Sequence, residues 1–397
     1  MSPVLLWLAF RRGSRKGWIK FLRFCFYTNS ISPHQLPFAR ELVKRLGVHN
    51  YRYVTQTRVS KARLQCGWHD EEEPWILTDS EYPHEVRSML ESCDVLMCGV
   101  RDFPLFEIRA ERRLPTFYVS ERWFKPIRLY RFFNLKVPGW FRMMRPSYFK
   151  MAYRMRRLLR EDIPFYYLPC GVHAAADMAR IVGWHRPVFS MAVPGASCEK
   201  IRLWGYFVAA TSGRSGHELS RQDILNVLWV GRMLDWKRVD TLVHAVARLQ
   251  RIGITMKLTL VGDGPERTRL EGLSKGLPIS FLSSQPIGHI RTLMREHDVY
   301  VLSSDAGEGW GGALNEALEE GMYAIGTYEA GASATMLKEA DLFHAGDSRA
   351  LARLLERCAE AKHRGTLNGQ GIADWSAAKA AERMMVLMDE VLGNTFC

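Results

Sequence analysis

A chain of 397 residues is too long for one ordinary core and predicts two domains of roughly 150–200 residues each. Hydrophobic residues make up 47% and charged residues 24%, which is typical of a folded globular protein and excludes a largely disordered one. The net charge of +13 predicts an anionic partner such as a nucleotide, a phospholipid or a nucleic acid. The eight cysteines form no C-x-x-C pair, so we expect reduced thiols and no structural zinc site.

Residues 1–18 form a basic N-terminal segment that includes a short apolar run at 4–10. The cations of this segment follow the run, whereas a secretory signal places its positive charge first. The run is also too short to cross a bilayer, and no other uncharged stretch approaches the needed length. We therefore expect a soluble or peripheral protein.

Strands and helices alternate along most of the chain, which predicts α/β architecture with parallel sheets. The first half predicts a Rossmann-like domain over residues 19–210, with an amphipathic helix that ends near Gly47. The strands expected in this half are Lys20–Tyr27, Tyr51–Thr55, Asp94–Cys98, Thr116–Val119, Phe165–Leu168 and Lys200–Val208.

A polar stretch with Gly and Ser predicts an inter-domain linker over residues 211–224. The alternation then restarts and predicts a second doubly wound domain over residues 225–378. Its expected strands are Asn226–Val230, Lys257–Val261, Ile279–Leu282, Val299–Ser303 and Tyr323–Thr327, and its expected helices are Val239–Ile252, Pro265–Lys275, Pro286–Glu296, Gly312–Glu320 and Ser333–Glu339. A last helix over 379–397 is expected to pack back on the first domain. The predicted fold class is two doubly wound Rossmann-like domains that face each other across a ligand cleft.

The strongest motif is EGWGGALNE at residues 308–316, where a strand runs through a Gly-rich turn into a helix. Glycines let the backbone approach a ligand closely, and the first N–H groups of a helix suit phosphate or sugar oxygens. Glu308 in the turn and Glu316 in the helix could bind two parts of one extended ligand. The alternative is a loop glutamate and a solvent-facing helical glutamate.

Two further motifs follow strands of the same domain. In VGRMLDWK at 230–237, Arg232 and Lys237 can converge on a diphosphate, or they are surface cations at a helix start. In VGDGPE at 261–266, Asp263 and Gly264 form either a nucleotide-contacting turn or an ordinary tight turn.

Together, these three motifs resemble glycosyltransferase family 4 of the GT-B fold over residues 225–345. The resemblance implies a retaining, metal-independent enzyme that needs no cofactor and uses a nucleotide-sugar donor. It further implies that Glu308 contacts the donor sugar, that Glu316 contacts the ribose, and that Arg232 and Lys237 bind the diphosphate. The remaining donor-side candidates are Gly309, Trp310, Gly311, Gly312, Asp263 and Gly264.

Some positions depart from the family pattern. Arg238 stands where the family usually has glycine, and Gly331-Ala332 replaces a double glycine. The first domain also lacks the Gly-Gly loop often found after its first strand.

The first half resembles bacterial polysaccharide and lipid-linked glycan transferases only loosely, through the segment at 30–47. It is therefore interpreted as the acceptor-side domain. Five polar side chains follow its expected strands and are candidates for acceptor contact: Asn29, Ser30, His34, Arg101 and Glu121. Each is also compatible with a helix-start or surface ion-pair role.

Residues 122–160 hold twelve cations, ten aromatic residues and no acid. This stretch is compatible with a solvated helix, a single-stranded nucleic-acid site or an anionic membrane face. We favour the membrane face, with Arg154, Arg156, Arg157 and Arg160 as its cations, and expect no nucleic-acid partner. The expected location is then the cytoplasm, peripheral at the inner face of the cell membrane.

Three functions remain open. The first is sugar transfer to a lipid-linked or cell-surface glycan acceptor. The second is epimerisation of a nucleotide-sugar on the same fold. The third is a non-catalytic basic protein that binds membranes or nucleic acid, which the intact Glu308, Glu316, Arg232 and Lys237 argue against.

Overall fold

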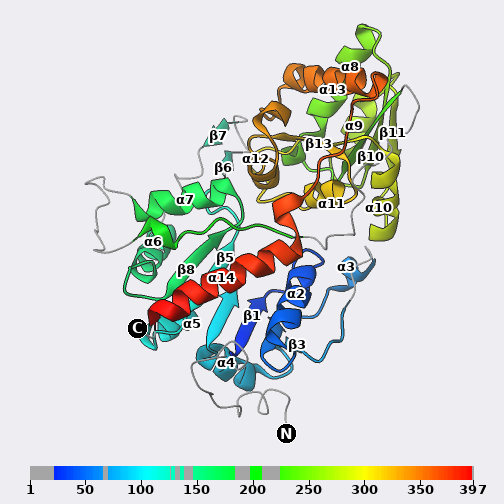
Figure 1. Ribbon diagram of the computed structural model, residues 1–397. Coiled ribbons are helices and arrows are strands. Elements are labelled where there is room, and N and C mark those ends of the chain that lie inside the picture. Colours follow the sequence, from blue (N-terminus) through cyan, green and yellow to red (C-terminus); the bar gives the residue numbers. More distant parts are fainter. Residues whose placement is uncertain are drawn as a thin grey trace. The chain divides into compact units, whose positions relative to one another are not determined.

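The structure is a computed structural model that describes residues 22–65, 70–125, 127–129, 135–137, 146–183, 197–207 and 224–395. The chain divides into two compact units (Figure 1). The first unit comprises Met1–Leu64, Trp68–Phe207 and Ala377–Cys397, and the second comprises Gln65–Gly67 and Val208–Ser376. The predicted basic segment 1–18 and residues 211–223 of the predicted linker lie outside the described residues.

The first unit is built on a six-stranded parallel sheet in the order β3-β2-β1-β4-β5-β8. Its strands are β1 (Phe24–Thr28), β2 (Tyr51–Thr55), β3 (Ile76–Thr78), β4 (Val95–Cys98), β5 (Thr116–Ser120) and β8 (Phe165–Pro169). A separate antiparallel pair is formed by β6 (Ile127–Leu129) and β7 (Leu135–Val137). The six-stranded order is that of a Rossmann fold, and its switch point lies between β1 and β4.

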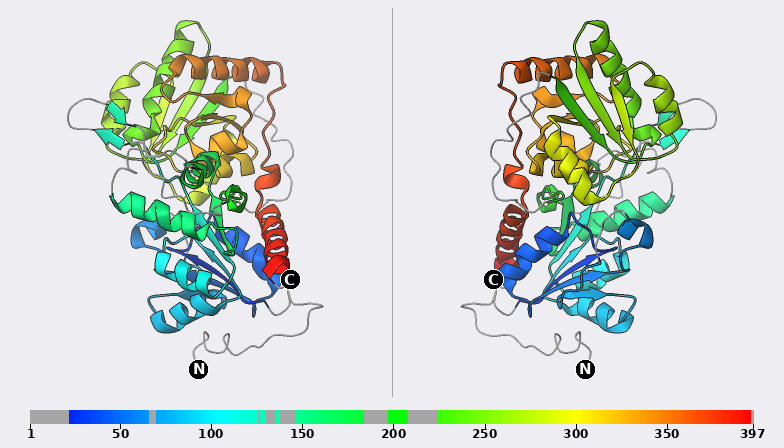
Figure 2. Two further views of the ribbon diagram at one scale, coloured as in Figure 1. Left: turned by 90° about the vertical axis from the view of Figure 1, so that its left-hand side faces the viewer. Right: turned by 90° about the vertical axis from the view of Figure 1, so that its right-hand side faces the viewer.

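Helices cover both faces of this sheet, since its apolar strands are buried on both sides. The helices of the unit are α2 (Leu36–Leu46), α3 (Lys61–Gln65), α4 (Pro83–Ser92), α5 (Phe103–Glu111), α6 (Pro146–Leu158), α7 (Val172–Val182), η4 (Cys198–Lys200) and α14 (Ala377–Thr395). One core joins alternate strand residues such as Cys25 to side chains of α4, α5, α6 and α7. On the other face, Phe26 packs edge-on against Phe38 of α2, and α14 packs beside α2 (Figure 2).

Several elements of this unit differ from the sequence prediction. The short strands β3, β6 and β7 were not predicted, because three residues leave no period to recognise. The predicted strand Lys200–Val208 is wrong: the segment makes single bridges through Ile201 and Trp204, after the short turn η4. Trp204 instead packs its ring against Phe38, so the apolar residues there cover a helix.

The second unit repeats the same topology, with the parallel order β11-β10-β9-β12-β13-β14. Its strands are β9 (Leu225–Val230), β10 (Met256–Val261), β11 (Ile279–Leu282), β12 (Val299–Leu302), β13 (Tyr323–Thr327) and β14 (Leu342–Phe343). The switch point therefore lies between β9 and β12. The strands predicted over 226–327 match the first five within a residue at either end.

The helices of the second unit are α8 (Val239–Arg251), α9 (Arg267–Leu273), α10 (Ile287–Glu296), α11 (Ala313–Glu319), α12 (Gly331–Met336) and α13 (Ser348–His363), with the single turns η5 (Asp235–Lys237), η6 (Glu339–Asp341) and η7 (Ala373–Trp375). A core of strand residues packs against α8, α9 and α13. The helix α13 was not among the predicted elements; Asp347 caps it by accepting hydrogen bonds from two of its first N–H groups.

The chain returns to the first unit for α14, and Arg45 at the end of α2 donates to the carbonyl of Ala378 at 3.2 Å. Helix α14 is 19 residues long. Within the described part of the chain, neither it nor any other helix is long and apolar enough to span a membrane.

Candidate functional sites

Loops at the carboxyl ends of the second sheet are held together by glycines. A Cβ atom at Gly262 would lie 2.0 Å from the carbonyl oxygen of Gly231, and one at Gly264 would lie 2.4 Å from that of Met233. A Cβ atom at Gly331 would likewise lie 2.2 Å from the carbonyl oxygen of Gly309. Such approaches are open only to glycine, so the loops after β9 and β10 meet backbone to backbone, and so do the segments after β12 and β13.

Lys237 and Glu308 meet at the switch point of this sheet. The ammonium group of Lys237, in η5 after β9, donates to Oε2 of Glu308, in the loop after β12. Ser304 donates to the same oxygen at 3.0 Å, and Ser303 donates to the carbonyl of Lys237 at 2.7 Å. The two charged side chains are 19% and 15% exposed, so the pair is shielded while part of it still reaches solvent. The structure thus brings together Lys237 and Glu308, two of the residues predicted for the donor site.

Trp310 packs within the loop that follows β12 and stabilises it. Its side chain is buried, its indole N–H donates to Oδ1 of Asn315 at 2.7 Å, and its ring packs against Trp375. Gly311 has φ +104°, a left-handed conformation, and a Cβ atom there would press on Leu302. We conclude that Trp310 and Gly311 shape the turn. Gly309 and Gly312 supply backbone beside them, and Gly312 immediately precedes α11.

Glu316 lies one turn inside α11 and is partly buried. Burial raises the pKa of its carboxyl group, and the nearby guanidinium group of Arg291 partly opposes that shift. Tyr300 of β12 is fully buried close to both motif glutamates, and burial together with these carboxylates raises its pKa. Both motif glutamates therefore lie close to the buried Tyr300 of β12.

Arg232 and Asp263 occupy the flanking loops in different ways. Arg232 is exposed, as a residue that binds a ligand from the loop surface would be. The carboxylate of Asp263 instead accepts hydrogen bonds from Arg267 and from the backbone N–H of Ser284, both at 2.7 Å. Asp263 thereby closes its own turn. These contacts, together with the close approach of Gly264 to Met233, favour the alternative in which this motif is an ordinary tight turn.

Arg238 adopts a left-handed conformation, with φ 47° and ψ 40°. Glycine takes this conformation at little cost, which explains why the family usually has glycine here. The guanidinium group of Arg238 pairs with Asp240 at 3.1 Å and lies over Gly346. The contacts of its side chain help to hold the strained backbone.

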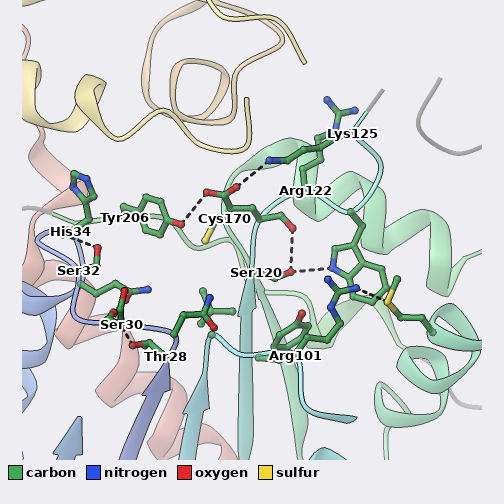
Figure 3. A pocket seen from close by; sticks show the side chains of 18 of the residues that line it. Thr28, Ser30, Ser32, His34, Arg101, Ser120, Arg122, Lys125, Cys170 and Tyr206 are labelled. Atoms are coloured by element: carbon green, nitrogen blue, oxygen red, sulfur yellow. Dashed lines mark hydrogen bonds and ion pairs between the residues drawn. The ribbon is translucent and has the colours of Figure 1, made fainter. Parts of the chain in front are cut away.

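A cavity of about 740 Å³ lies within the first unit, where strands β1, β4, β5 and β8 end (Figure 3). All five predicted acceptor-side residues line it: Asn29, Ser30, His34, Arg101 and Glu121. They come from three different loops, which the parallel topology brings to one edge of the sheet. The cavity thus lies at the carboxyl ends of the first sheet, as the Gly-rich loops do at those of the second.

Glu121 is held between two donors in this cavity. Tyr206 donates its hydroxyl to Oε1 at 3.0 Å, and Lys125 reaches Oε2 at 3.4 Å, as the dashed lines in Figure 3 show. The Tyr206 ring also stacks on His34, with ring centres 5.9 Å apart and planes inclined by 18°. A carboxylate beside a flat aromatic pair suits a sugar, which offers hydroxyl groups to the one and C–H faces to the other.

Other lining residues were not predicted as site residues: Arg63, Ser120, Arg122, Trp123, Lys125 and Tyr206. Arg122, Trp123 and Lys125 open the basic aromatic stretch, so composition alone had marked them. Arg63 belongs to α3, and its guanidinium group donates to the Ser30 hydroxyl at 2.7 Å. Neither Arg63 nor Tyr206 directly follows an expected strand, so no signal in the sequence marked them.

The four arginines chosen as a membrane face do not form a uniform exposed cluster. Arg154 makes a two-pronged ion pair with Glu107 at 2.7 Å, and Arg160 pairs with Asp162 at 2.9 Å. Arg156 is buried, with 8% of its surface exposed, whereas Arg157 is exposed. The helical period separates these side chains, which sequence adjacency had grouped. Residues 130–134 and 138–145 of the basic stretch lie outside the described residues.

The described residues contain no group of three or more His, Cys, Asp or Glu side chains that could hold a metal ion. Arg232 and Lys237 are two of the cationic side chains in the described loops that follow strands of the second sheet.

Residues 225–361 match the family model described as glycosyl transferases group 1. No curated protein matches the chain in sequence.

Several solved structures share the whole two-unit architecture. A glycosyltransferase from Rickettsia africae ESF-5 has a TM-score of 0.59 at 14% identity, over 94% of this chain and 99% of that one. Anabaena HepE in complex with UDP has a TM-score of 0.58 at 16% identity, with the same two coverages. WaaB, a lipopolysaccharide outer core galactosyltransferase, has a TM-score of 0.57 at 13% identity, over 93% and 99% of the two chains. The chain has the GT-B fold. The predicted fold class is confirmed, and the family-model match falls within its second unit.

The glycine contacts lead to a test of the loop geometry. We expect Gly331→Ala to destabilise the second unit by about 1–3 kcal/mol, since the new methyl group would meet the Gly309 carbonyl and neither backbone can give way easily. The matched control is Gly272→Ala in α9, where no atom lies within 4 Å of the added methyl group. That change should stabilise the protein by roughly 0.5–1 kcal/mol. Denaturant unfolding of both variants provides the measurement, and equal effects would show that the two loops can separate.

Proposed function

We propose that the protein is a retaining, metal-independent glycosyltransferase that moves a sugar from a nucleotide-sugar to a lipid-linked or cell-surface glycan acceptor. The observation that carries the proposal is the Lys237–Glu308 pair at the switch point of a group 1 glycosyltransferase domain. A cation and a carboxylate in that place suit the two halves of a nucleotide-sugar, its diphosphate and its hydroxyl-rich sugar.

In the proposed reaction, the bond between the anomeric carbon and the diphosphate oxygen breaks. A new bond forms to a hydroxyl oxygen of the acceptor, which loses its proton, and the anomeric configuration is kept. Lys237 and Arg232 stabilise the negative charge that develops on the leaving diphosphate. Glu308 orients the donor sugar and Glu316 binds the ribose. These roles follow the family 4 resemblance of the motif, which is intact at all four positions.

The first unit supplies the acceptor side in this proposal. Glu121 has no second carboxylate beside it in the lining of the cavity, and it is fixed by Tyr206 and Lys125. It is therefore suited to accept a hydrogen bond from an acceptor hydroxyl. Structures of HepE contain UDP or UDP-glucose, so UDP-sugars are the first donors to test.

Lys237→Ala and Glu316→Ala should each lower kcat/KM by roughly tenfold to a thousandfold while the fold is retained, because each removes a charge-assisted contact to the donor. Lys275→Ala, an exposed lysine of the same unit, is the control and should change nothing. The assay follows radiolabelled sugar from donor to glycan acceptor. Normal kinetics in a folded Lys237→Ala protein would remove Lys237 from the diphosphate site. Label recovered only as an isomeric nucleotide-sugar would favour the epimerase.

Activity should persist in excess EDTA within about twofold, because Arg232 and Lys237 neutralise the diphosphate that Mg²⁺ serves in other transferases. The same transfer assay, run with EDTA and then with added Mg²⁺ or Mn²⁺, tests this. A complete loss of activity that either ion restores would contradict metal independence.

Peripheral membrane attachment is a separate part of the proposal, supported by the acid-free stretch at 122–160. The protein should co-sediment with anionic vesicles and not with neutral ones, and binding should weaken as salt is raised. Arg157→Gln should weaken that binding by about fivefold, since one cation near such a surface contributes about 1 kcal/mol. Arg251→Gln, an exposed arginine of the second unit, is the control. Equal binding to both vesicle types, or to neither, would leave a solvated helix as the account of this stretch.

A further inference from the structure

The cavity of the first unit is strongly cationic. Four of the lining side chains carry a positive charge, and one carries a negative charge: Arg63, Arg101, Arg122 and Lys125 against Glu121. A neutral sugar needs hydrogen-bonding groups of both kinds but gains little from such an excess of cations. The lining is therefore more cationic than recognition of hydroxyl groups requires.

Two of these cations have a carboxylate partner within the unit. Lys125 faces Glu121, and Arg122 lies 3.4 Å from the buried carboxylate of Asp177, which also accepts hydrogen bonds from the backbone N–H groups of Trp123 and Phe124. Their charges are thus partly balanced where they stand.

Arg101 differs, because its guanidinium group contacts neutral side chains. The group lies 5.9 Å from the centre of the Trp123 ring and donates to Sδ of Met151 at 2.8 Å. Among the described residues, no carboxylate forms an ion pair with Arg101. A thioether is a weak hydrogen-bond acceptor, so most of the donor capacity of this arginine is available to a ligand.

The support beneath Arg101 is rigid. The indole N–H of Trp123 donates to Oγ of Ser120 at 3.0 Å, and Ser120 also bonds the buried hydroxyl of Tyr167 at 2.8 Å. A guanidinium group that rests on a fixed aromatic face is held ready for a planar, two-pronged contact with an oxyanion. In the view of Figure 3, Arg101 and Arg122 lie on one side of the cavity, and His34 and Tyr206 lie on the other. Arg101 thus lies apart from the His34–Tyr206 ring pair, whereas Arg63 contacts Ser30 and Lys125 contacts Glu121.

We propose that this cavity recognises an acceptor that carries an oxyanion, a phosphate or a carboxylate, and that Arg101 is the residue that selects for it. That the ligand is a sugar acceptor rests on the proposed function. Recognition of an anion by the cavity is inferred from the residues that line it. Arg101 is a binding residue here, and Glu121 serves the hydroxyl groups.

Calorimetric titration of the full chain tests this with three sugars of one ring type: methyl glucoside, glucose 6-phosphate and glucuronate. Saturating UDP is present throughout to occupy the donor loops. We expect a charged sugar to bind at least tenfold more tightly than methyl glucoside. Arg101→Gln should abolish that preference, and Arg101→Lys should restore part of it, because the charge returns without the planar fork. Arg112→Gln, an exposed arginine of the same unit, should leave it unchanged, and thermal unfolding checks that each variant is folded.

Tight binding of glucose 6-phosphate alone identifies a phosphate group as the feature recognised, and equal binding of glucuronate identifies oxyanions in general. The proposal is overturned if methyl glucoside binds as tightly as the charged sugars, if neither charged sugar binds at millimolar concentration, or if Arg101→Gln keeps the preference. A parallel UDP titration separates the two proposals, since UDP binding should fail in Lys237→Ala and survive in Arg101→Gln. Anion binding that depends on Arg101 without any UDP binding would reject the proposed donor and retain this inference.

Discussion

Close approach of one backbone to another, at positions that admit no side chain, is the constraint on which the second unit depends. Gly262 and Gly264 press on the carbonyls of Gly231 and Met233, and Gly331 presses on that of Gly309. These contacts join the loop after β9 to the loop after β10, and the loop after β12 to the segment after β13. The backbone N–H of Asp305 donates to the carbonyl of Trp236 at 2.7 Å, which places η5 beside the loop after β12. The Lys237–Glu308 pair depends on that placement, because its two members lie 71 positions apart in the sequence. Ala332, next to Gly331, is buried yet carries a methyl group, so only one of the two positions requires glycine.

The two units share a strand order but build the ends of their sheets differently. In the second unit, contiguous Gly-rich turns shape the site. The residues of the sequence motif are therefore largely the residues that form the site. In the first unit, the cavity is lined by side chains from separate segments, and hydrogen bonds such as those of Ser120 and Tyr206 fix them. Lining of this kind can change residue by residue without disturbing a backbone contact. The Gly-rich loops of the second unit are in this sense the more constrained of the two sites, and the cavity of the first unit is the more adaptable.

The same contrast determines what the sequence could predict. Alternating apolar strands and amphipathic helices predicted both doubly wound units, because parallel strands buried on two faces leave an unmistakable pattern. The three-residue β3 and two-residue β14 were too short to leave one. The polar residues predicted from their positions after strands line the cavity, since topology brings strand ends together, and their contact with an acceptor stays a prediction. Arg63 and Tyr206 reach it from a short helix and an irregular segment, whose positions only tertiary packing decides. The burial of Arg156 was not predicted, because a high content of cations does not show which face of the helix each cation occupies.

The pairing of Lys237 with Glu308 also bears on how a donor would be held. A nucleotide-sugar brings a doubly charged diphosphate towards a loop that already contains a carboxylate, and that repulsion would oppose binding if Glu308 stood alone. Lys237 has three N–H donors, of which the contact with Glu308 needs one. It can therefore neutralise the carboxylate and still offer N–H groups to a phosphate oxygen. Ser304 holds the same carboxylate oxygen, so Glu308 keeps its orientation when the lysine is shared. Removing Lys237 would thus cost more than one phosphate contact, because it would also leave a shielded carboxylate uncompensated beside an anion.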